Sequence, residues 1–216
     1  MGRLFDILFA SIGLLISGPF ILFGIFGIYF SSPGPVFYKA ARVGRASSVF
    51  TMYKLRTMHV NQTFESAITL VDDARVFRFG MLLRASKIDE LPQLFNILIG
   101  DMAIVGPRPE DPGIVKRVYC DWMNESLEVR PGLTSPGTLF AYVYGDKYLK
   151  DNDIEGSYSQ ELLPRKLIAD IEYFKNSTIF TDVVVAVKTF VVILALLLGV
   201  PTPRLVPDMA KEKTLL

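Results

Sequence analysis

Apolar residues are concentrated in two runs, near the two ends of the chain. Residues 7–30 contain no charged residue, and about 20 apolar residues are enough to cross a bilayer as a helix. The second run, residues 179–200, is interrupted by Asp182 and Lys188, which leaves residues 189–200 as its uninterrupted part. That stretch is short for a membrane span. We therefore expect an interfacial or core helix there, with a second span as the weaker alternative.

The first apolar run has a helix-breaking centre, formed by Ser17, Gly18 and Pro19. Proline lacks an N–H group and its ring clashes with the preceding turn, so a sharp kink is expected near Pro19. Two topologies follow: a kinked transmembrane helix, or a helix–break–helix segment that enters and leaves one face of the membrane. A cleaved signal peptide fits poorly, because the run is too long and residues 31–35 form no small-x-small cleavage site.

Charge gives the membrane segment an orientation. Five cations follow it before the first acidic residue, Glu65: they are Lys39, Arg42, Arg45, Lys54 and Arg56. Cytoplasmic flanks are enriched in lysine and arginine, so the downstream side is predicted to be cytoplasmic. The N-terminus would then lie outside in the spanning topology and inside in the re-entrant one, and the residues alone leave both open.

Residues 31–178 have the pattern of a globular body. Short β-like runs at 36–38 and 49–53, separated by a turn at 42–48, predict a hairpin. Helical spacing of apolar residues is found at 77–83, 91–99, 114–127 and 160–174. Prolines favour an extended segment at 105–112, and polar residues predict a loop at 61–73 and a break at 176–178. The fold class predicted is α/β, mostly α with a short β-hairpin.

Composition narrows the chemistry. The 216 residues include one cysteine and one histidine, and their formal net charge is +1. These numbers exclude a strongly basic nucleic-acid binder, an intrachain disulfide framework and a zinc site of several cysteines or histidines. Any reaction must therefore depend on carboxylates, arginines, lysines and the backbone.

An adjacent acidic pair, Asp89 and Glu90, begins an apolar helical pattern that has Pro92 in its first turn. The purely structural interpretation is that Asp89 is an N-cap and that Glu90 interacts favourably with the helix dipole. In the functional interpretation, the helix N-terminus keeps the Asp89 carboxylate ionised. Such a carboxylate can attack phosphorus or hold Mg²⁺, and Glu90 could order the attacking group or move a proton.

Basic residues near this pair suit a polyanion such as a diphosphate. Arg84 lies five residues before Asp89, and Arg108 lies between two prolines in a stiff segment that would orient its guanidinium. Lys54 and Arg56 alternate along a predicted strand, and Arg130 lies beside a turn. The plain alternative for each arginine is a surface ion pair of little energetic value. The sequence has no P-loop or dinucleotide-binding glycine motif.

The chain resembles the bacterial sugar transferases, the monotopic phosphoglycosyl transferases of the polyprenol-phosphate pathway. The resemblance extends from the first apolar run to about residue 188. Five ordered blocks carry it: residues 53–58 (YKLRTM), 89–96 (DELPQLFN), 100–102 (GDM), 106–109 (GPRP) and 130–134 (RPGLT). The sequence departs from many relatives at residues 135–139, where the donor's nucleotide or sugar could be contacted.

The resemblance implies an enzyme that moves a sugar 1-phosphate from a UDP-sugar to undecaprenyl phosphate and releases UMP. Asp89 would form a covalent phosphosugar intermediate, with Mg²⁺ between Asp89 and the diphosphate, and Glu90 would position or deprotonate the lipid phosphate. The residues implied in binding phosphates are Arg84, Arg108, Lys54 and Arg56. The nucleotide-sugar region implied is Arg130, Pro131, Gly132 and Thr134.

The resemblance also implies a re-entrant helix at residues 1–34, broken at Ser17 and Pro19. A cytoplasmic catalytic domain would follow at 35–188, and an apolar helix end and tail at 189–216. The location implied is the bacterial inner membrane, where the chain would begin glycan assembly in contact with membrane lipids. No nucleic-acid partner is expected, and a homodimer is left open. The alternatives are a membrane-associated hydrolase of nucleotide-diphosphate sugars and a non-catalytic membrane scaffold.

Overall fold

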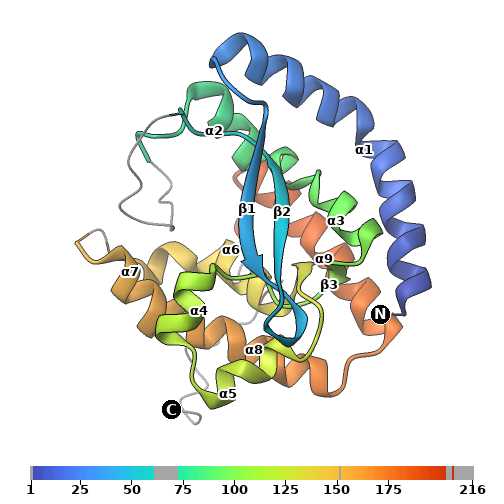
Figure 1. Ribbon diagram of the computed structural model, residues 1–216, viewed down its shortest axis with the longest axis vertical. Helices are drawn as coiled ribbons and strands as arrows, with labels where there is room; N and C mark the ends of the chain where they lie inside the picture. Colours follow the sequence, from blue (N-terminus) through green and yellow to red (C-terminus); the bar gives the residue numbers. More distant parts are fainter. Residues whose placement is uncertain (1, 61–72, 151, 203–205, 207–216) are drawn as a thin grey trace.

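The computed structural model describes residues 2–60, 73–150, 152–202 and 206 (Figure 1). Apart from Asp73, the loop predicted at 61–73 lies outside the described residues, as do residues 203–205 and 207–216 of the predicted helix end and tail. The described part is a mostly helical α/β structure with two small sheets. This confirms the predicted fold class.

The first apolar run forms a single long helix, α1 (Arg3–Ser31), which continues through Pro19. The helix bends about half-way along its length (Figure 1), as expected of a kink at Pro19, but it is not interrupted there, so the predicted break is wrong. A bend loses little more than the hydrogen bond that proline cannot make, whereas a break would expose several backbone groups in apolar surroundings. The Ser17 hydroxyl does not bind the backbone carbonyl that Pro19 leaves without a donor, because this buried hydroxyl has no hydrogen-bond partner in the described structure.

One face of α1 packs on the body, and small residues allow the close approach. A Cβ at Gly24 would lie 2.5 Å from Leu55 Cδ1, and a Cβ at Gly13 would lie 3.3 Å from Leu94 Cδ1. The opposite face exposes large apolar side chains, among them Leu15 and Phe26. The helix is therefore held along the body by one stripe and presents an apolar surface on the other side.

The predicted hairpin is confirmed. β1 (Phe37–Val43) and β2 (Val49–Leu55) are antiparallel, from the pair Phe37–Leu55 to the pair Val43–Val49, and the turn contains η1 (Arg45–Ser47). Next follow α2 (Arg78–Ala85), η2 (Ile88–Glu90) and α3 (Gln93–Ile99). The two predicted helices at 77–83 and 91–99 therefore form, with a 3₁₀ turn between them.

Asn96 joins α3 to the hairpin. Its side chain is fully buried, accepts a hydrogen bond from the Tyr53 N–H at 3.0 Å and donates to the Thr51 carbonyl at 2.7 Å. It also donates to Asp101 at 3.1 Å. These bonds fix β2 relative to the segment that begins at Asp89.

The predicted extended segment begins with β3 (Ala103–Val105), which pairs in parallel with β4 (Gly132–Thr134). Backbone contact is tight here, since a Cβ at Gly132 would lie 2.1 Å from the nitrogen of Gly106. The helix predicted at 114–127 is divided into shorter pieces: α4 (Pro112–Val118), α5 (Asp121–Asn124) and η3 (Glu125–Leu127).

The C-terminal half is helical. Its elements are α6 (Pro136–Tyr148), α7 (Ile154–Ser157), the π-helical turn η4 (Tyr158–Leu162), α8 (Leu163–Lys175) and α9 (Ile179–Leu197). The helix predicted at 160–174 is thus confirmed, while α6 was not predicted. The break predicted at 176–178 is confirmed, and there the Thr178 hydroxyl accepts from the Thr181 N–H and caps α9.

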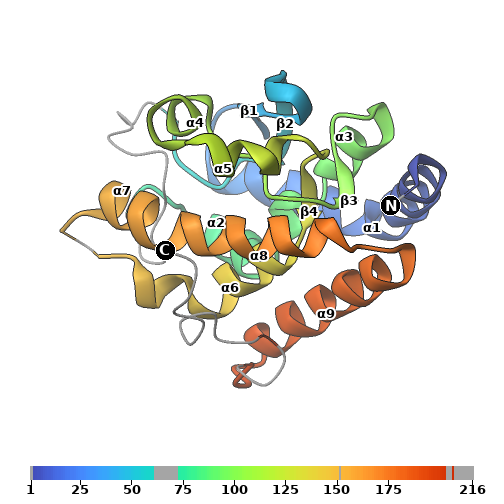
Figure 2. The same ribbon diagram turned by 90° about the horizontal axis from the view of Figure 1, so that it is seen from below.

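The second apolar run, α9, lies along the outside of the body (Figure 2). Asp182, Val185 and Val192 are its buried residues, and Phe180 and Phe190 are largely exposed. The expectation of a core helix is therefore wrong for α9, because most of its apolar surface has no protein partner in the described structure. By length and composition alone, α1 and α9 could each cross a membrane.

We predict that Asn96→Ala lowers the free energy of unfolding by at least about 2 kcal/mol, because it removes three hydrogen bonds and leaves backbone groups of β2 without partners. Thermal unfolding followed by circular dichroism in detergent measures this change. The matched control is Asn124→Ala, which makes the same substitution at an exposed residue. An equal effect of the two substitutions would contradict the role given to Asn96.

Candidate active site

A cavity of about 1020 Å³ opens beside η2. Asp89 lines it together with cations from three other segments: Lys54 on β2, Arg84 on α2 and Arg108 in the loop after β3. The structure thus gathers at one cavity residues that are up to 54 positions apart in the sequence. Such a pocket is large enough for a substrate of nucleotide-sugar size.

Asp89 is buried in the 3₁₀ turn η2 and does not cap a helix. Asp89 is 6% exposed, and α3 begins four residues further on, at Gln93. The prediction of an N-cap is therefore wrong. Oδ1 of Asp89 is buried without a hydrogen-bond partner in the described structure. A buried polar atom without a partner is costly, and this one lies on a residue that lines the cavity.

Glu90 binds two of the cations. Lys54 Nζ lies 3.1 Å from Glu90 Oε1, and Arg108 donates from Nη1 to Glu90 Oε2 at 3.1 Å and from Nη2 to Oε1. The Arg108 contact is bidentate, the arrangement in which a guanidinium binds a carboxylate with the most defined geometry. Glu90 therefore fixes the positions of Lys54 and Arg108 relative to η2.

The two adjacent carboxyls have opposite pKa shifts. Burial, together with the charge of Glu90, raises the pKa of Asp89 to about 6. Burial acts in the same direction on Glu90, but the charges of Arg108 and Lys54 outweigh it and hold the pKa of Glu90 well below its usual range. The expectation that a helix N-terminus stabilises the ionised form of Asp89 is therefore wrong. At pH 7 Asp89 is nevertheless largely ionised, and it is more basic than an ordinary aspartate.

Arg84 and Lys87 complete the cationic surroundings of Asp89. Nη1 of Arg84 is buried without a hydrogen-bond partner in the described structure, and Arg84 lines the cavity. Lys87 precedes η2 in a left-handed conformation (φ 57°), and its Nζ lies 4.2 Å from the centre of the Tyr142 ring. The unpaired donor of Arg84 and the unpaired oxygen of Asp89 both suit a phosphate-bearing ligand.

The fit to Mg²⁺ depends on these same atoms. Among the described residues, no group of three or more acidic, histidine or cysteine side chains could form a complete metal site. Mg²⁺ is commonly held by one or two carboxylates together with substrate phosphates. The unpartnered Asp89 Oδ1 fits that mode of binding, because it is a carboxylate oxygen without a protein donor.

Arg56 and the segment 130–134 have structural contacts of their own. Arg56 lies in the cavity wall, but it donates to the carbonyls of Ser32 and Pro35, where the chain leaves α1. Arg130 Nη2 lies 3.4 Å from Asp6 Oδ2 near the start of α1. Neither Arg130 nor Pro131, Gly132 and Thr134 lines the cavity. The last three belong to the β4 region, which supports the backbone that carries Arg108.

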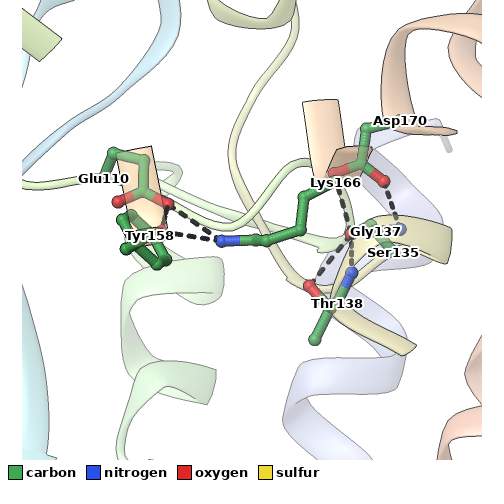
Figure 3. Close-up of polar contacts among 7 residues, drawn as sticks. All are labelled: Glu110, Ser135, Gly137, Thr138, Tyr158, Lys166 and Asp170. Carbon is green, nitrogen blue, oxygen red and sulfur yellow. Dashed lines mark hydrogen bonds and ion pairs between the residues drawn. The ribbon is translucent and has the colours of Figure 1, made fainter. Parts of the chain in front are cut away.

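A second polar cluster in the cavity wall, Glu110, Tyr158 and Lys166, was not predicted (Figure 3). Lys166 Nζ donates to Glu110 Oε1 at 3.0 Å and to the Tyr158 hydroxyl at 2.9 Å. One sequence signal could have revealed it. Lys166 and Asp170 share a helical face with Leu163 and Leu167, and all four are buried. Charged residues within an apolar helical stripe indicate buried polar contacts.

Comparison with known proteins identifies the family of this chain and several related enzymes. The bacterial sugar transferase family matches residues 1–196. A UDP-glucose:undecaprenyl-phosphate glucose-1-phosphate transferase of Caulobacter vibrioides is 32% identical over 195 residues, which are 87% of this chain and 67% of the relative. A UDP-N-acetylgalactosamine-undecaprenyl-phosphate N-acetylgalactosaminephosphotransferase of Aeromonas hydrophila is 35% identical over 197 residues, 88% of this chain and 42% of the relative.

An undecaprenyl-phosphate galactose phosphotransferase of Salmonella typhimurium is 31% identical over 208 residues, which are 89% of this chain and 40% of the relative. The chain thus spans between two-fifths and two-thirds of the length of these three relatives. The names of the three relatives differ in the sugar that each transfers, and all three include undecaprenyl phosphate.

We predict that Asp89→Asn stabilises the protein at pH 8. The pKa of Asp89 is raised to about 6 in the folded state, so its ionisation above that pH costs folding free energy, of the order of 1–3 kcal/mol. Asparagine avoids this cost. The advantage should shrink as the pH falls from 7 to 4, where Asp89 becomes protonated in the folded protein.

Unfolding of both proteins in denaturant at pH 4, 6 and 8 measures the difference. Asp146→Asn, at an exposed position of α6, is the matched control and should show no such pH-dependent gain. An Asp89→Asn protein that is less stable than the parent at pH 8 would show that the ionised carboxylate stabilises the fold.

Proposed function

We propose that this chain, which belongs to the bacterial sugar transferase family, transfers a sugar 1-phosphate from a UDP-sugar to undecaprenyl phosphate. The observation that carries the proposal is the buried, unpaired carboxylate oxygen of Asp89 at a cavity lined by Lys54, Arg84 and Arg108. A carboxylate can approach an anionic phosphate only where cations offset the repulsion. The reaction would provide the first lipid-linked sugar for exopolysaccharide assembly.

In the first half-reaction, an oxygen of Asp89 attacks the β-phosphorus of the donor. An O–P bond forms to Asp89, the bond from that phosphorus to the bridging oxygen breaks, and UMP leaves with the bonding electrons. The pKa of about 6 keeps Asp89 ionised at neutral pH and more basic than an ordinary aspartate, which suits a nucleophile. The unpaired Nη1 of Arg84 is a donor for a phosphate oxygen.

In the second half-reaction, a phosphate oxygen of undecaprenyl phosphate attacks the same phosphorus, and the bond to Asp89 breaks. The contacts of Glu90 favour a positioning role in both steps over proton transfer. It is bound by two cations and its pKa is held well below the usual range, so it is a weak base at neutral pH. Its function would be to hold Lys54 and Arg108 at the cavity.

Mg²⁺ is the cofactor that we propose, with Asp89 as the protein group that would hold it beside the donor diphosphate. When bound, the ion would neutralise charge on the phosphates and favour departure of UMP.

The non-catalytic alternative depends on Asp89 being a helix cap, and Asp89 caps no helix. A hydrolase would use the same carboxylates but needs no lipid. The large exposed apolar surfaces of α1 and α9 favour a lipid acceptor over water.

We further propose that α1 enters one leaflet and returns to the same side. Near its start, Arg3 donates to the carbonyls of Ile97 and Leu98, and Asp6 accepts from the Ile104 N–H at 3.1 Å. At its end, the Ser32 carbonyl accepts from Arg56 at 2.7 Å. A helix of 29 residues is about 44 Å long, enough to cross a bilayer. Because both ends bind one body, a spanning arrangement would require that body on both faces.

The cations after α1 favour the cytoplasmic side of the inner membrane for that body. UDP-sugars are soluble donors, so a site on this side could bind them together with a lipid acceptor.

We predict that Asp89→Asn abolishes formation of a covalent phosphosugar adduct and lowers UMP release by at least about 1,000-fold, because the amide is a poor nucleophile. The parent is incubated with Mg²⁺ and UDP-glucose, UDP-galactose or their N-acetylated counterparts. Intact-protein mass spectrometry then detects the adduct, and UMP release is followed with and without undecaprenyl phosphate. Asp146→Asn serves as the matched control and should retain both signals.

Three outcomes would contradict the mechanism. An Asp89→Asn protein that still releases UMP at the parental rate would exclude Asp89 as the nucleophile. Continuous UMP release without undecaprenyl phosphate would indicate a hydrolase. A parent that releases UMP from none of the donors, with or without lipid, would overturn the proposed activity.

We predict that residue 2 and Cys120 lie on the same side of the membrane. Gly2→Cys is tested in the Cys120→Ser background with a membrane-impermeant maleimide, and the parent with its exposed Cys120 is the reference. Neither cysteine should react in intact cells, and both should react after permeabilisation. Labelling of residue 2 in intact cells would show that α1 spans the membrane.

A further inference from the structure

Glu110, Tyr158 and Lys166 form a buried cluster in the cavity wall that the proposed chemistry does not use (Figure 3). Lys166 comes from α8, Tyr158 from η4 and Glu110 from the loop that also carries Arg108. The side chains of Lys166 and Glu110 are 6% and 9% exposed. Burying an ion pair costs desolvation energy that an apolar pair would avoid, so this cluster is poorly explained by stability alone.

Counting the hydrogen bonds shows what the cluster still offers. An ammonium has three N–H donors, and Lys166 uses two of them, on Glu110 Oε1 and the Tyr158 hydroxyl. Tyr158 donates to the same oxygen, Glu110 Oε1. In the described structure Glu110 Oε2 accepts no hydrogen bond, and this atom is not completely buried. The cluster therefore retains one donor and one acceptor at the cavity wall.

The free N–H of Lys166 and the free oxygen of Glu110 suit an uncharged group better than a phosphate. The ammonium and the carboxylate cancel in charge, and Oε2 of Glu110 would repel an anion. A hydroxyl can donate to the carboxylate while a neighbouring oxygen accepts from the ammonium. Two adjacent hydroxyls, or a hydroxyl beside an acetamido group, offer this combination on a sugar ring.

The position of Glu110 relative to Arg108 favours the sugar over the uracil. Residues 108 and 110 are separated by Pro109, so their Cα atoms are at most about 7 Å apart. The sugar of the donor is bonded to the β-phosphate that Asp89 would attack. The uracil is further from that phosphorus by another phosphate and a ribose. A phosphate beside Arg108 would therefore bring the sugar, not the base, within reach of Glu110.

The part of the cavity wall near the end of α1 differs from the polar cluster in its lining. Pro35, Phe37 and Val60 line it close to the point where the chain leaves α1, and Phe37 and Val60 are more than two-fifths exposed. Arg56 and His59 also line this part of the wall, which lies beside the end of α1, and its exposed apolar side chains suit the isoprenoid chain of the acceptor. The polar cluster is thus left for the water-soluble donor.

A second set of bonds holds Lys166 in place. One helical turn beyond it, Asp170 accepts from the Gly137 N–H at 2.7 Å and from the Ser135 hydroxyl at 3.0 Å (Figure 3). These bonds attach α8 to the start of α6, which contributes Thr138 to the cavity. Lys166 is therefore carried by a helix that is fixed to α6.

We propose that Glu110, Tyr158 and Lys166 form the sugar subsite of this enzyme, binding ring hydroxyl or acetamido groups of the donor. The inference rests on the proposed transferase activity and adds to it the residues that select the sugar.

The test is steady-state kinetics of UMP release by Glu110→Gln, Tyr158→Phe and Lys166→Met at saturating undecaprenyl phosphate. For the donor that the parent prefers, we expect KM to rise 10- to 100-fold in the glutamine and methionine variants, because each loses a hydrogen bond to a charged group. The kcat should change by less than about threefold. The inhibition constant of UDP, which lacks the sugar, should stay within about twofold of the parental value in every variant.

The matched control is Lys175→Met, the same substitution at an exposed residue of α8, which should leave KM unchanged. Thermal unfolding and adduct formation at saturating donor show whether each variant is folded. If Lys166→Met does not fold, Glu110→Gln, which is close in size to the native residue, decides the question.

An active parent whose variants keep the parental KM would overturn the sugar subsite and leave the transferase intact. A parallel rise in the inhibition constant of UDP would assign the cluster to the nucleotide and overturn the sugar assignment. A parent that releases no UMP from any donor would overturn the transferase and this inference with it.

Discussion

The site depends on the two ion pairs of Glu90. Lys54 comes from the hairpin and Arg108 from the loop after β3, and both are drawn to one carboxylate in η2. Removing ions from water is costly, so they must be hydrogen-bonded to each other with good geometry. Because Glu90 binds both cations, the adjacent Asp89 keeps an oxygen without a protein donor. The adjacent carboxyls therefore divide two tasks, one holding the cations and the other remaining available for a ligand.

This division has a cost in stability, which the surrounding backbone offsets. A pKa raised to about 6 means that ionised Asp89 disfavours the folded state. The loop that carries Arg108 is held by the parallel pairing of β3 with β4, where Gly106 and Gly132 approach too closely for any side chain. Asn96 fixes β2, the strand that carries Lys54, through its hydrogen bonds to Thr51 and Tyr53. Rigid elements on both sides thus maintain an arrangement of charges that is unfavourable by itself.

Local patterns predicted the parts of the fold that local interactions decide. The hairpin follows from alternating β-formers around a turn, and the helices near 77–99 and 160–174 follow from apolar periodicity. The β3–β4 pair could not be predicted in this way, because each strand has three residues and its partner is far along the chain. The structure places Asp89 at one cavity with Arg84 and Arg108, as the sequence predicted, but the pKa shift of Asp89 was predicted in the wrong direction. A helix start was assumed where the chain forms a 3₁₀ turn, and the burial that dominates the shift is not encoded in neighbouring residues.

The arginines that the sequence associated with substrate binding also explain how the body is held at α1. Arg56 binds carbonyls at the end of α1, and Arg130 pairs with Asp6 near its start. A guanidinium has five donors and stays charged when buried, so it can fix a chain end that has lost its helical partners. These two contacts fix the body relative to both ends of a helix whose outer face is apolar. Pro35 lines the cavity and lies four residues beyond Ser31, where α1 ends, so the same contacts also fix the cavity relative to the apolar helix. The proposed transfer joins a lipid phosphate to a group from a soluble donor, so it needs a cavity at a fixed distance from α1, and Arg56 and Arg130 help to set that distance through these contacts.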